Sequence, residues 1–437
     1  MHQVEIGGQE WASIGKIGKQ PYPICCAHWR AGSGGGYGLV IRAIYEPVRV
    51  LSGVGGFMAI TLLTYFIGEG WKALVNWVRD KWRERRKRGG VMAVNQTAWC
   101  RVEGFLTTPS FTGFTKEDLF IKRFIPKGWG QDIAALSNIA EAIHLRHEAA
   151  LLDADAAQTL IRETIQRASH MTVSPYRSPI ETVNDLGRHG YYLEHLNIIL
   201  GMAFKLGVYE YANLNLKISE HLQQQSLAQK NAHAPLMPNV RMRWSADQAA
   251  ILHSLWLCDQ NHRTDFHQEP VGRWLEHMNA NMTNSDTGLF ETEAMRVKRY
   301  SRQPRGCSLA YLIHYSSSFA PSVANDQWSN FKEHMLVDGL FLSGFREYLP
   351  TYEGKWTPDT GPIVGGIGVA ATGLGLKTAA TLGDVEAHST LKRSVDRVLG
   401  FCQSTRDLPY LNIVTAMGSD VLASAIYSNS ILRQENA

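Results

Sequence analysis

Four short stretches of the sequence combine carboxylates with histidine or aromatic residues, and they lie at 184–197, 241–248, 285–293 and 352–362. Asp, Glu and His transfer protons, and burial beside apolar walls can bring their pKa values toward neutrality. We therefore expect acid–base chemistry from His195, Asp247 and Asp359. Binding of a small-molecule substrate is expected from Asp185, Tyr192, Arg243, Trp244, Glu291 and Trp356.

Each of these candidates also has a purely structural interpretation. Asp247 can cap a helix, because Asp side chains accept hydrogen bonds from the free amides of a helix start. His195 lies among apolar residues at helical spacing, which is typical of a buried structural histidine. The sequence leaves both interpretations open.

Neither a cofactor nor a metal ion is expected. The stretch Gly366-Ile-Gly368-Val-Ala-Ala371 matches a loose dinucleotide pattern, but the strand and parallel βαβ unit that this pattern requires are not evident. His144, His147 and Glu148 stand in an order that fits neither common zinc-protease motif. Six cysteines without a CxxC pair form neither a disulfide framework nor a zinc signature.

The distribution of charge predicts a membrane anchor. Net charge is only +4 over 437 residues, so we expect no nucleic-acid partner. Residues 50–68 contain no ionisable side chain except Tyr65. At about 1.5 Å per residue this stretch reaches roughly 28 Å, enough for one helical pass through the hydrocarbon layer. The alternative is a buried or interfacial helix, which Gly53, Gly55 and Gly56 would permit.

A strongly basic segment at 79–88 follows this apolar stretch, whereas only Arg42 and Arg49 lie just before it. The positive-inside rule then predicts a single-pass protein of the inner or plasma membrane, with its carboxyl-terminal domain in the cytoplasm. The basic segment marks topology or binds anionic lipid headgroups. An oligomer or a larger membrane complex is compatible with this arrangement.

We expect four regions along the chain. They are a flexible glycine-rich tail (1–47), a transmembrane and basic juxtamembrane segment (48–90), a linker or lid (91–130) and a helical domain (131–437). In the last region apolar residues recur at helical spacing and prolines fall between the periodic segments. The predicted helices are 131–151, 154–170, 187–206, 209–228, 245–261, 269–283, 306–319, 322–336, 363–382, 384–403 and 409–432, with short hairpins at 288–292 and 339–347.

A faint repeat indicates how these helices are arranged. Trp274, His277-Met278 and Gly288-Leu289-Phe290 recur as Trp328, His334-Met335 and Gly339-Leu340-Phe341, at separations of 54, 57 and 51 residues. A period near fifty marks one supersecondary unit, here a helix, a turn and a returning helix. The sequence therefore predicts an all-α fold, an (α/α)6 toroid or barrel preceded by a single transmembrane helix. An open α-solenoid would also fit the number of helices.

Residues 184–384 resemble the linalool dehydratase/isomerase family. The likeness rests on short motifs: Glu194-His195-Leu196-Asn197, Ser254-Leu255-Trp256, Gly288-Leu289-Phe290, the glycine-rich stretch 365–376 and Leu382-Gly383-Asp384. The resemblance implies an (α/α)6 barrel with His195, Asp247 and Glu291 around one pocket. The family's catalytic cysteines precede the Ser-Leu-Trp helix, whereas this chain has no cysteine from Leu227 to Leu257. The resemblance therefore transfers the fold and the position of the pocket, and not the linalool chemistry.

Two functions follow as expectations. The first is a membrane-anchored barrel enzyme that uses pocket carboxylates on a terpenoid, lipid-like or sugar substrate, as a lyase, a dehydratase/isomerase or a glycoside-active enzyme. In that case Asp247 or Asp359 transfers the proton and His195 assists or orients the substrate. The alternative is a non-catalytic toroid that forms part of a membrane protein assembly.

Overall fold

The computed structural model describes residues 76, 92–123, 130–294, 303–339, 342–352, 354, 357, 359–404 and 420–435. All of them belong to one compact unit of the chain. No helix within these ranges is long and apolar enough to cross a bilayer. The predicted span 50–68, the basic segment 79–88 and the tail 1–47 lie outside the described residues, so the membrane anchor stays a prediction.

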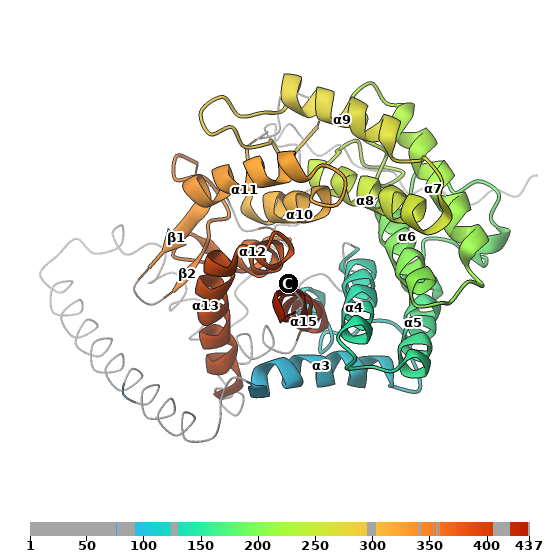
Figure 1. Ribbon diagram of the computed structural model, residues 1–437, viewed down its shortest axis with the longest axis horizontal. Helices are drawn as coiled ribbons and strands as arrows, with labels where there is room; N and C mark the ends of the chain where they lie inside the picture. The colour runs from blue at the N-terminus through green and yellow to red at the C-terminus, as the bar shows by residue number, and fades with distance from the viewer. Residues whose placement is uncertain are drawn as a thin grey trace, which may run out of the picture. The chain divides into compact units, whose positions relative to one another are not determined.

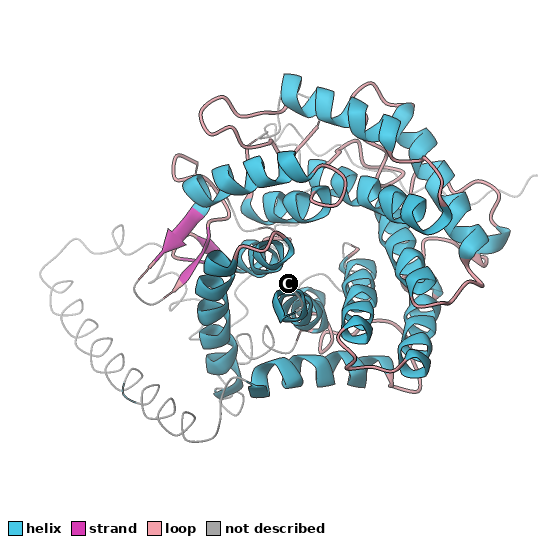
Figure 2. Cartoon of the chain, in the orientation of Figure 1, coloured by secondary structure: helices cyan, strands magenta, loops and turns pink. Residues whose placement is uncertain are grey.

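The described helices form two concentric layers (Figures 1 and 2). The inner helices are α4 (Gln131–Glu148), α6 (Gly190–Lys205), α8 (Ser245–His262), α10 (Gly306–Ser316), α12 (Val369–Thr381) and α15 (Val421–Glu435). Each packs against the next, and α15 packs against α4 and closes the ring. The outer helices are α3 (Met92–Leu106), α5 (Ala154–Ser169), α7 (Ala212–Leu227), α9 (Gln268–Asn281), α11 (Pro321–Met335) and α13 (Val385–Ser404). The expected helical toroid is confirmed for this part of the chain, and an open solenoid is excluded because the ring closes.

The two layers differ in which residues they bury. The inner helix α6 buries every residue from Tyr192 to Ala203, because it has neighbours on all sides. The outer helix α9 buries only Pro270, Val271, Trp274 and Met278, a stripe at helical spacing. That stripe is what an amphipathic surface helix shows toward its core.

The inner helices run parallel. Their buried hydrogen bonds join residues at similar depth in neighbouring helices: Ser137 of α4 binds His195 of α6, and Asn197 of α6 binds Ser254 of α8. Since each outer helix returns the chain to the starting side, the amino-terminal ends of all the inner helices open on one face. That face is called the mouth below.

Short hairpins follow two of the outer helices and lead to the mouth. After α9, Thr283 pairs with Phe290, and after α11 strand β1 (Leu336–Asp338) pairs with β2 (Ser343–Phe345) through Leu336 and Phe345. Phe345 is therefore the structural counterpart of Phe290. Phe341, which corresponds to Phe290 in the sequence repeat, lies outside the described residues.

Two expected boundaries also changed. A hairpin of β3 (Ile363–Val364) and β4 (Ile367–Gly368) precedes α12, which starts six residues later than predicted. The segment 91–130, expected to be a linker or lid, supplies the outer helix α3, which packs on α15. The buried residues Trp99, Val102 and Leu106 form its apolar stripe, and the guanidinium of Arg146 lies 4.3 Å from the centre of the Trp99 ring.

A buried ion cluster, consisting of Glu141, Lys377, Arg433 and His314, joins the helices where the ring closes. Lys377 of α12 and Arg433 of α15 both bind the carboxylate of Glu141 in α4. Burial alone would raise the pKa of Glu141, but these two cations and His314 hold it well below its usual range. The carboxylate is therefore ionised inside the core and depends on its cationic partners.

Candidate active site

The candidate site lies at the mouth, where the first turns of the inner helices bring titratable groups together. Tyr191 is the second residue of α6 and Asp247 the third of α8. Asp359 lies in the loop that leads to β3. Burial, followed by the charges of Asp247, Glu194 and Asp359, raises the pKa of the Tyr191 phenol. Three carboxyl groups from separate parts of the chain therefore lie close enough to this phenol to raise its pKa.

Asp247 and Asp359 have contrasting surroundings. Asp247 is half-buried, and burial together with the charge of Asp359 raises its pKa to about 7. Its place in the first turn of α8 favours the ionised form through the helix dipole, but burial outweighs that effect. Asp359 is exposed, and its Oδ2 lies 3.3 Å from Nη2 of Arg305. One carboxyl group is thus poised to hold a proton at neutral pH, while the other has a cationic partner.

His195 of α6 is fully buried next to Glu194. Its Nδ1 lies 2.7 Å from the hydroxyl of Ser137, which itself donates to the carbonyl of Ala134. The network therefore places the proton on Nδ1, and Nε2 accepts from the Tyr311 hydroxyl at 3.3 Å. Burial, followed by the charge of Lys377, lowers the pKa of His195 to about 3. The imidazole stays neutral and orients Tyr311.

Glu194 belongs to the same cluster, although the sequence analysis did not include it among the candidate site residues. It is fully buried, and burial and the charge of Asp247 raise its pKa well above the usual range. The residues that follow it in α6 are mostly apolar, so the sequence pattern there is that of a core helix. The one available signal was an acid next to His195 inside an apolar helix.

Arg305 and Glu347 hold the loop of Asp359 against α10. Nε of Arg305 lies 3.2 Å from Oε1 of the buried Glu347, and Nη2 donates to the Thr357 hydroxyl at 2.9 Å. Glu347 Oε2 accepts from the amide of Cys307 at 3.2 Å, so it caps α10 from a distant part of the chain. These contacts hold the loop that carries Asp359 in place.

The remaining predicted binding residues are only partly brought to this cluster. The Tyr192 hydroxyl donates to the carbonyl of Ala168 in the outer helix α5. Asp185 is exposed and accepts from the amide of Gly187 in a turn. The Tyr192 hydroxyl is therefore directed to α5. The structure therefore places Tyr191, and not Tyr192, among the side chains of the candidate site.

Arg243, Trp244 and Glu291 lie close to the start of α8. The Arg243 guanidinium donates to the carbonyls of Val240 and Met242 in its own loop. Trp244 pairs through its backbone with Glu293. The carbonyl of Glu291 accepts from the Ser245 hydroxyl at 3.0 Å. These residues position α8, and Trp356 lies outside the described residues.

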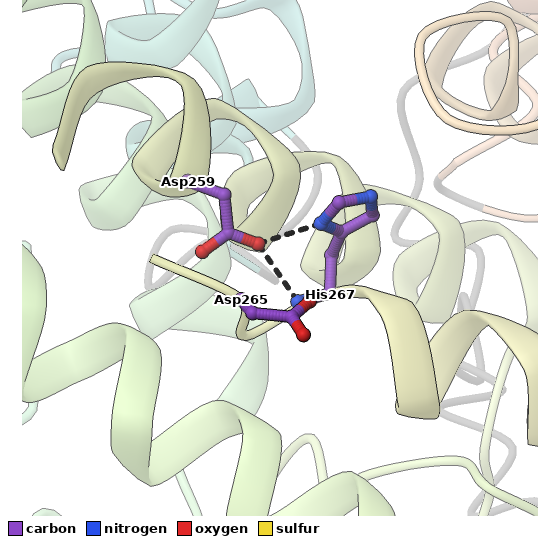
Figure 3. Close-up of side chains that lie close together, drawn as sticks. All are labelled: Asp259, Asp265 and His267. Carbon is purple, nitrogen blue, oxygen red and sulfur yellow. Dashed lines mark hydrogen bonds and ion pairs between the residues drawn. The ribbon is translucent and has the colours of Figure 1, made fainter. Parts of the chain in front are cut away.

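A cluster of possible metal ligands lies at the carboxyl-terminal end of α8, away from the mouth (Figure 3). It consists of Asp259, Asp265 and His267. Both oxygens of Asp259 accept hydrogen bonds from the following loop: Oδ1 from Thr264 and Phe266, and Oδ2 from the amide and Nδ1 of His267. Hydrogen-bond donors of the protein therefore occupy both oxygens of the Asp259 carboxylate. These bonds stabilise the turn between α8 and α9.

Comparisons with known proteins were made for the sequence and for the fold. No family model matches the sequence, and no curated protein matches it. Membership of the linalool dehydratase/isomerase family is therefore not shown; what is shown is the toroid that the resemblance implied.

Several solved structures are similar in fold. One is a family 76 glycoside hydrolase from a bovine Bacteroides thetaiotaomicron strain, with 10% identity over 71% of this chain and 69% of that chain, at a TM-score of 0.46. Another is an alpha-1,6-mannanase of Salegentibacter sp. HEL1_6, with 10% identity over 78% and 99% and a TM-score of 0.45. A third is an unsaturated glucuronyl hydrolase specific for heparin, with 10% identity over 79% and 96% and a TM-score of 0.45. At these TM-scores the likeness assigns no activity to this chain.

Proposed function

We propose that this protein is a glycoside-active enzyme in which Asp247 donates a proton to the leaving oxygen and Asp359 acts as the ionised partner. The observation that carries the proposal is the contrast between these two neighbouring carboxyl groups. Groups whose surroundings push their protonation apart are the usual signature of an acid–base pair. Cleavage of a glycosidic bond by two carboxyl groups requires this division of roles.

The protonation of Asp247 suits a general acid. With a pKa of about 7, Asp247 is protonated in about half of the protein molecules at neutral pH. A proton held at this pKa is easily transferred in the transition state. Asp359 is exposed, and its Oδ2 lies 3.3 Å from Nη2 of Arg305. It can therefore accept a proton from water or stabilise positive charge on the sugar ring.

The chemistry of the surrounding side chains favours a hydroxylated substrate over an apolar one. Tyr191 and Tyr311 are half-buried, and both carry polar hydroxyl groups at the mouth. Glu194 and His195 lie beside them. The Tyr191 hydroxyl and the Glu194 carboxyl group can exchange hydrogen bonds with sugar hydroxyls, whereas a terpenoid chain would leave Glu194 without a partner.

The test uses aryl glycosides that differ only in the leaving group. A phenyl leaving group needs protonation, whereas a 2,4-dinitrophenyl group does not. We expect Asp247→Asn to lower kcat/KM on phenyl glycosides by about 10²- to 10⁴-fold and to change the dinitrophenyl rate little. Asp359→Asn should lower both rates. Asp155→Asn is the matched control, since this exposed residue starts the outer helix α5.

Three results would contradict the proposal. Equal losses of Asp247→Asn on both leaving groups would remove it as the proton donor. Turnover of a prenyl alcohol without cleavage of any glycoside would instead indicate dehydration. Absence of turnover on both substrate classes would favour the non-catalytic toroid. In the wild type, kcat/KM should fall as the pH rises above about 7, where Asp247 loses its proton.

The proposed membrane anchor is tested separately, on intact cells. If residues 50–68 span the membrane with the tail outside, an impermeant thiol reagent should label Cys25 and Cys26. Cys100 is exposed on the folded domain and should be labelled only after lysis. Labelling of Cys100 in intact cells, or protection of the two tail cysteines, would contradict this orientation.

A further inference from the structure

Within the described residues, the buried carboxyl group of Glu194 has no hydrogen-bond partner. Its side chain is 0% exposed, and neither Oε1 nor Oε2 has a hydrogen-bond partner. The His195 Nε2 atom lies 3.6 Å from Oε1, beyond hydrogen-bond range, and already accepts from Tyr311. Buried polar groups in folded proteins nearly always have a partner. A carboxyl group without one at the mouth indicates a partner that arrives with a ligand.

The groups around Glu194 are acidic, aromatic or neutral. Asp247 of α8 acts on it electrostatically, and Tyr191 of its own helix and Tyr311 of α10 both sense its charge. His195 is neutral, as shown above. Asp247, Tyr191 and Tyr311 are only half-buried, so the side chains around Glu194 are in contact with solvent.

The cations described near this cluster are bound elsewhere. Arg305 binds Glu347 and Asp359. Arg243 donates to backbone carbonyls of its own loop. Lys377 belongs to the buried ion cluster at the ring closure. Within the described residues, therefore, no cation contacts Glu194 or the Asp247 carboxylate.

We propose that Glu194, together with the ring of Tyr191, binds a protonated amino group of the substrate. An ammonium group has three donors, so it can satisfy both oxygens of the Glu194 carboxylate at once. It also compensates the negative charge of that carboxylate and is attracted to the face of a tyrosine ring. A ligand hydroxyl can satisfy a protonated Glu194 but cannot compensate the charge of the carboxylate.

This inference deepens the proposed function, on which it rests, by naming the substrate class: a carbohydrate that bears a free amino group. The amino group would occupy the space between α6 and α8 at the mouth. Because burial raises the pKa of Glu194 well above its usual range in the free protein, the arrival of a cation should displace the proton of this carboxyl group. A neutral ligand has no such effect.

The test measures binding without turnover, on the full chain. The probes are trans-2-aminocyclohexanol and trans-1,2-cyclohexanediol, which have a six-membered ring and differ only in the amino group. An alkyl amine stays protonated at pH 7, as lysine does. Titration calorimetry in two buffers of different ionisation enthalpy gives both the affinity and the number of protons released.

We expect the amine to bind at least about tenfold more tightly than the diol, the factor typical of a charge-assisted hydrogen bond, and to release protons. Glu194→Gln should lose most of this preference and most of the proton release, while its affinity for the diol stays the same. Glu220→Gln, an exposed change on the outer helix α7, should behave as wild type.

Equal affinity of the wild type for amine and diol would overturn the inference, as would binding of the amine without release of protons. Both results come from the wild type, so they do not depend on the stability of a variant. They are also independent of the glycosidase assay. If the glycosidase assay contradicts the proposed function but the protein still prefers the amine, the binding of an amino group stands without the glycosidase activity.

Discussion

Replacing Asp247 by asparagine should change how the stability of the protein depends on pH. The ordinary pKa of an aspartate is about 3.9, and burial together with Asp359 raises that of Asp247 to about 7 in the folded protein. Between these two values the folded state holds a proton that the unfolded state has released. The free energy of unfolding must therefore fall as the pH rises through this window.

The magnitude follows from the size of the shift. A difference of about three pKa units corresponds to about 4 kcal/mol over the whole window, and to about 2.5 kcal/mol between pH 5 and pH 8. These are upper limits, because Asp247 is partly in contact with solvent. The asparagine side chain of the Asp247→Asn variant has no proton to lose, so its contribution to stability should be independent of pH.

Urea denaturation of the full chain at pH 5, 6, 7 and 8, followed by tryptophan fluorescence, measures this effect. The wild type should lose about 2 kcal/mol more stability than Asp247→Asn between pH 5 and pH 8. The m value should be unchanged if only stability is altered. Asp155→Asn, at the start of α5, is the control and should follow the wild type.

Parallel pH profiles for the wild type and Asp247→Asn would refute the reasoning. That result would mean that Asp247 is ionised at neutral pH in the folded protein. Its assignment as proton donor would then be lost as well, because both conclusions depend on the same raised pKa.

Two further changes test the fold around the site. Lys377→Met breaks the buried ion cluster at the ring closure and should cost about 3 kcal/mol, whereas Lys392→Met removes a partly exposed pair within one helix and should cost less than about 1 kcal/mol; similar midpoints in urea would contradict the role of the cluster. Gly306→Ala would bring a Cβ atom to 2.0 Å from the carbonyl oxygen of Arg346 and should destabilise by about 1–3 kcal/mol. Gly272→Ala in α9 meets no atom within 4 Å and should stabilise by about 0.5–1 kcal/mol, so equal effects of the two glycine changes would contradict the packing described.

Helix boundaries could be read from the sequence because their signals are local. The predicted helix 245–261 is observed as α8 (Ser245–His262), and the predicted helix 154–170 as α5 (Ala154–Ser169). Apolar spacing, prolines between segments and glycines at turns act within a few residues of the boundary they mark. The start of α12 was harder to predict, because the short β3–β4 hairpin and the first turn of the helix contain the same kinds of small residue.

The side chains that form the candidate site could be predicted only in part. Tyr191 and Tyr192 are neighbours of one type, yet only Tyr191 is directed to the mouth. On an outer helix the apolar stripe indicates which side faces inward. On an inner helix such as α6 nearly every residue is buried, so no stripe indicates which side faces the axis of the ring. The sequence alone therefore favoured Tyr192 over Tyr191 and left Glu194 among core residues.

The sequence by itself determined the residue types available for proton transfer, the helices that carry them and the period that arranges those helices in pairs. These properties depend on local spacing. Tertiary structure alone decided that the charge of Asp359 acts on Asp247, that burial and the charge of Lys377 keep His195 neutral, and that Glu194 has no hydrogen-bond partner among the described residues. Each of these depends on burial and on charges brought from distant parts of the chain, and a pKa is set by that environment and not by the residue type.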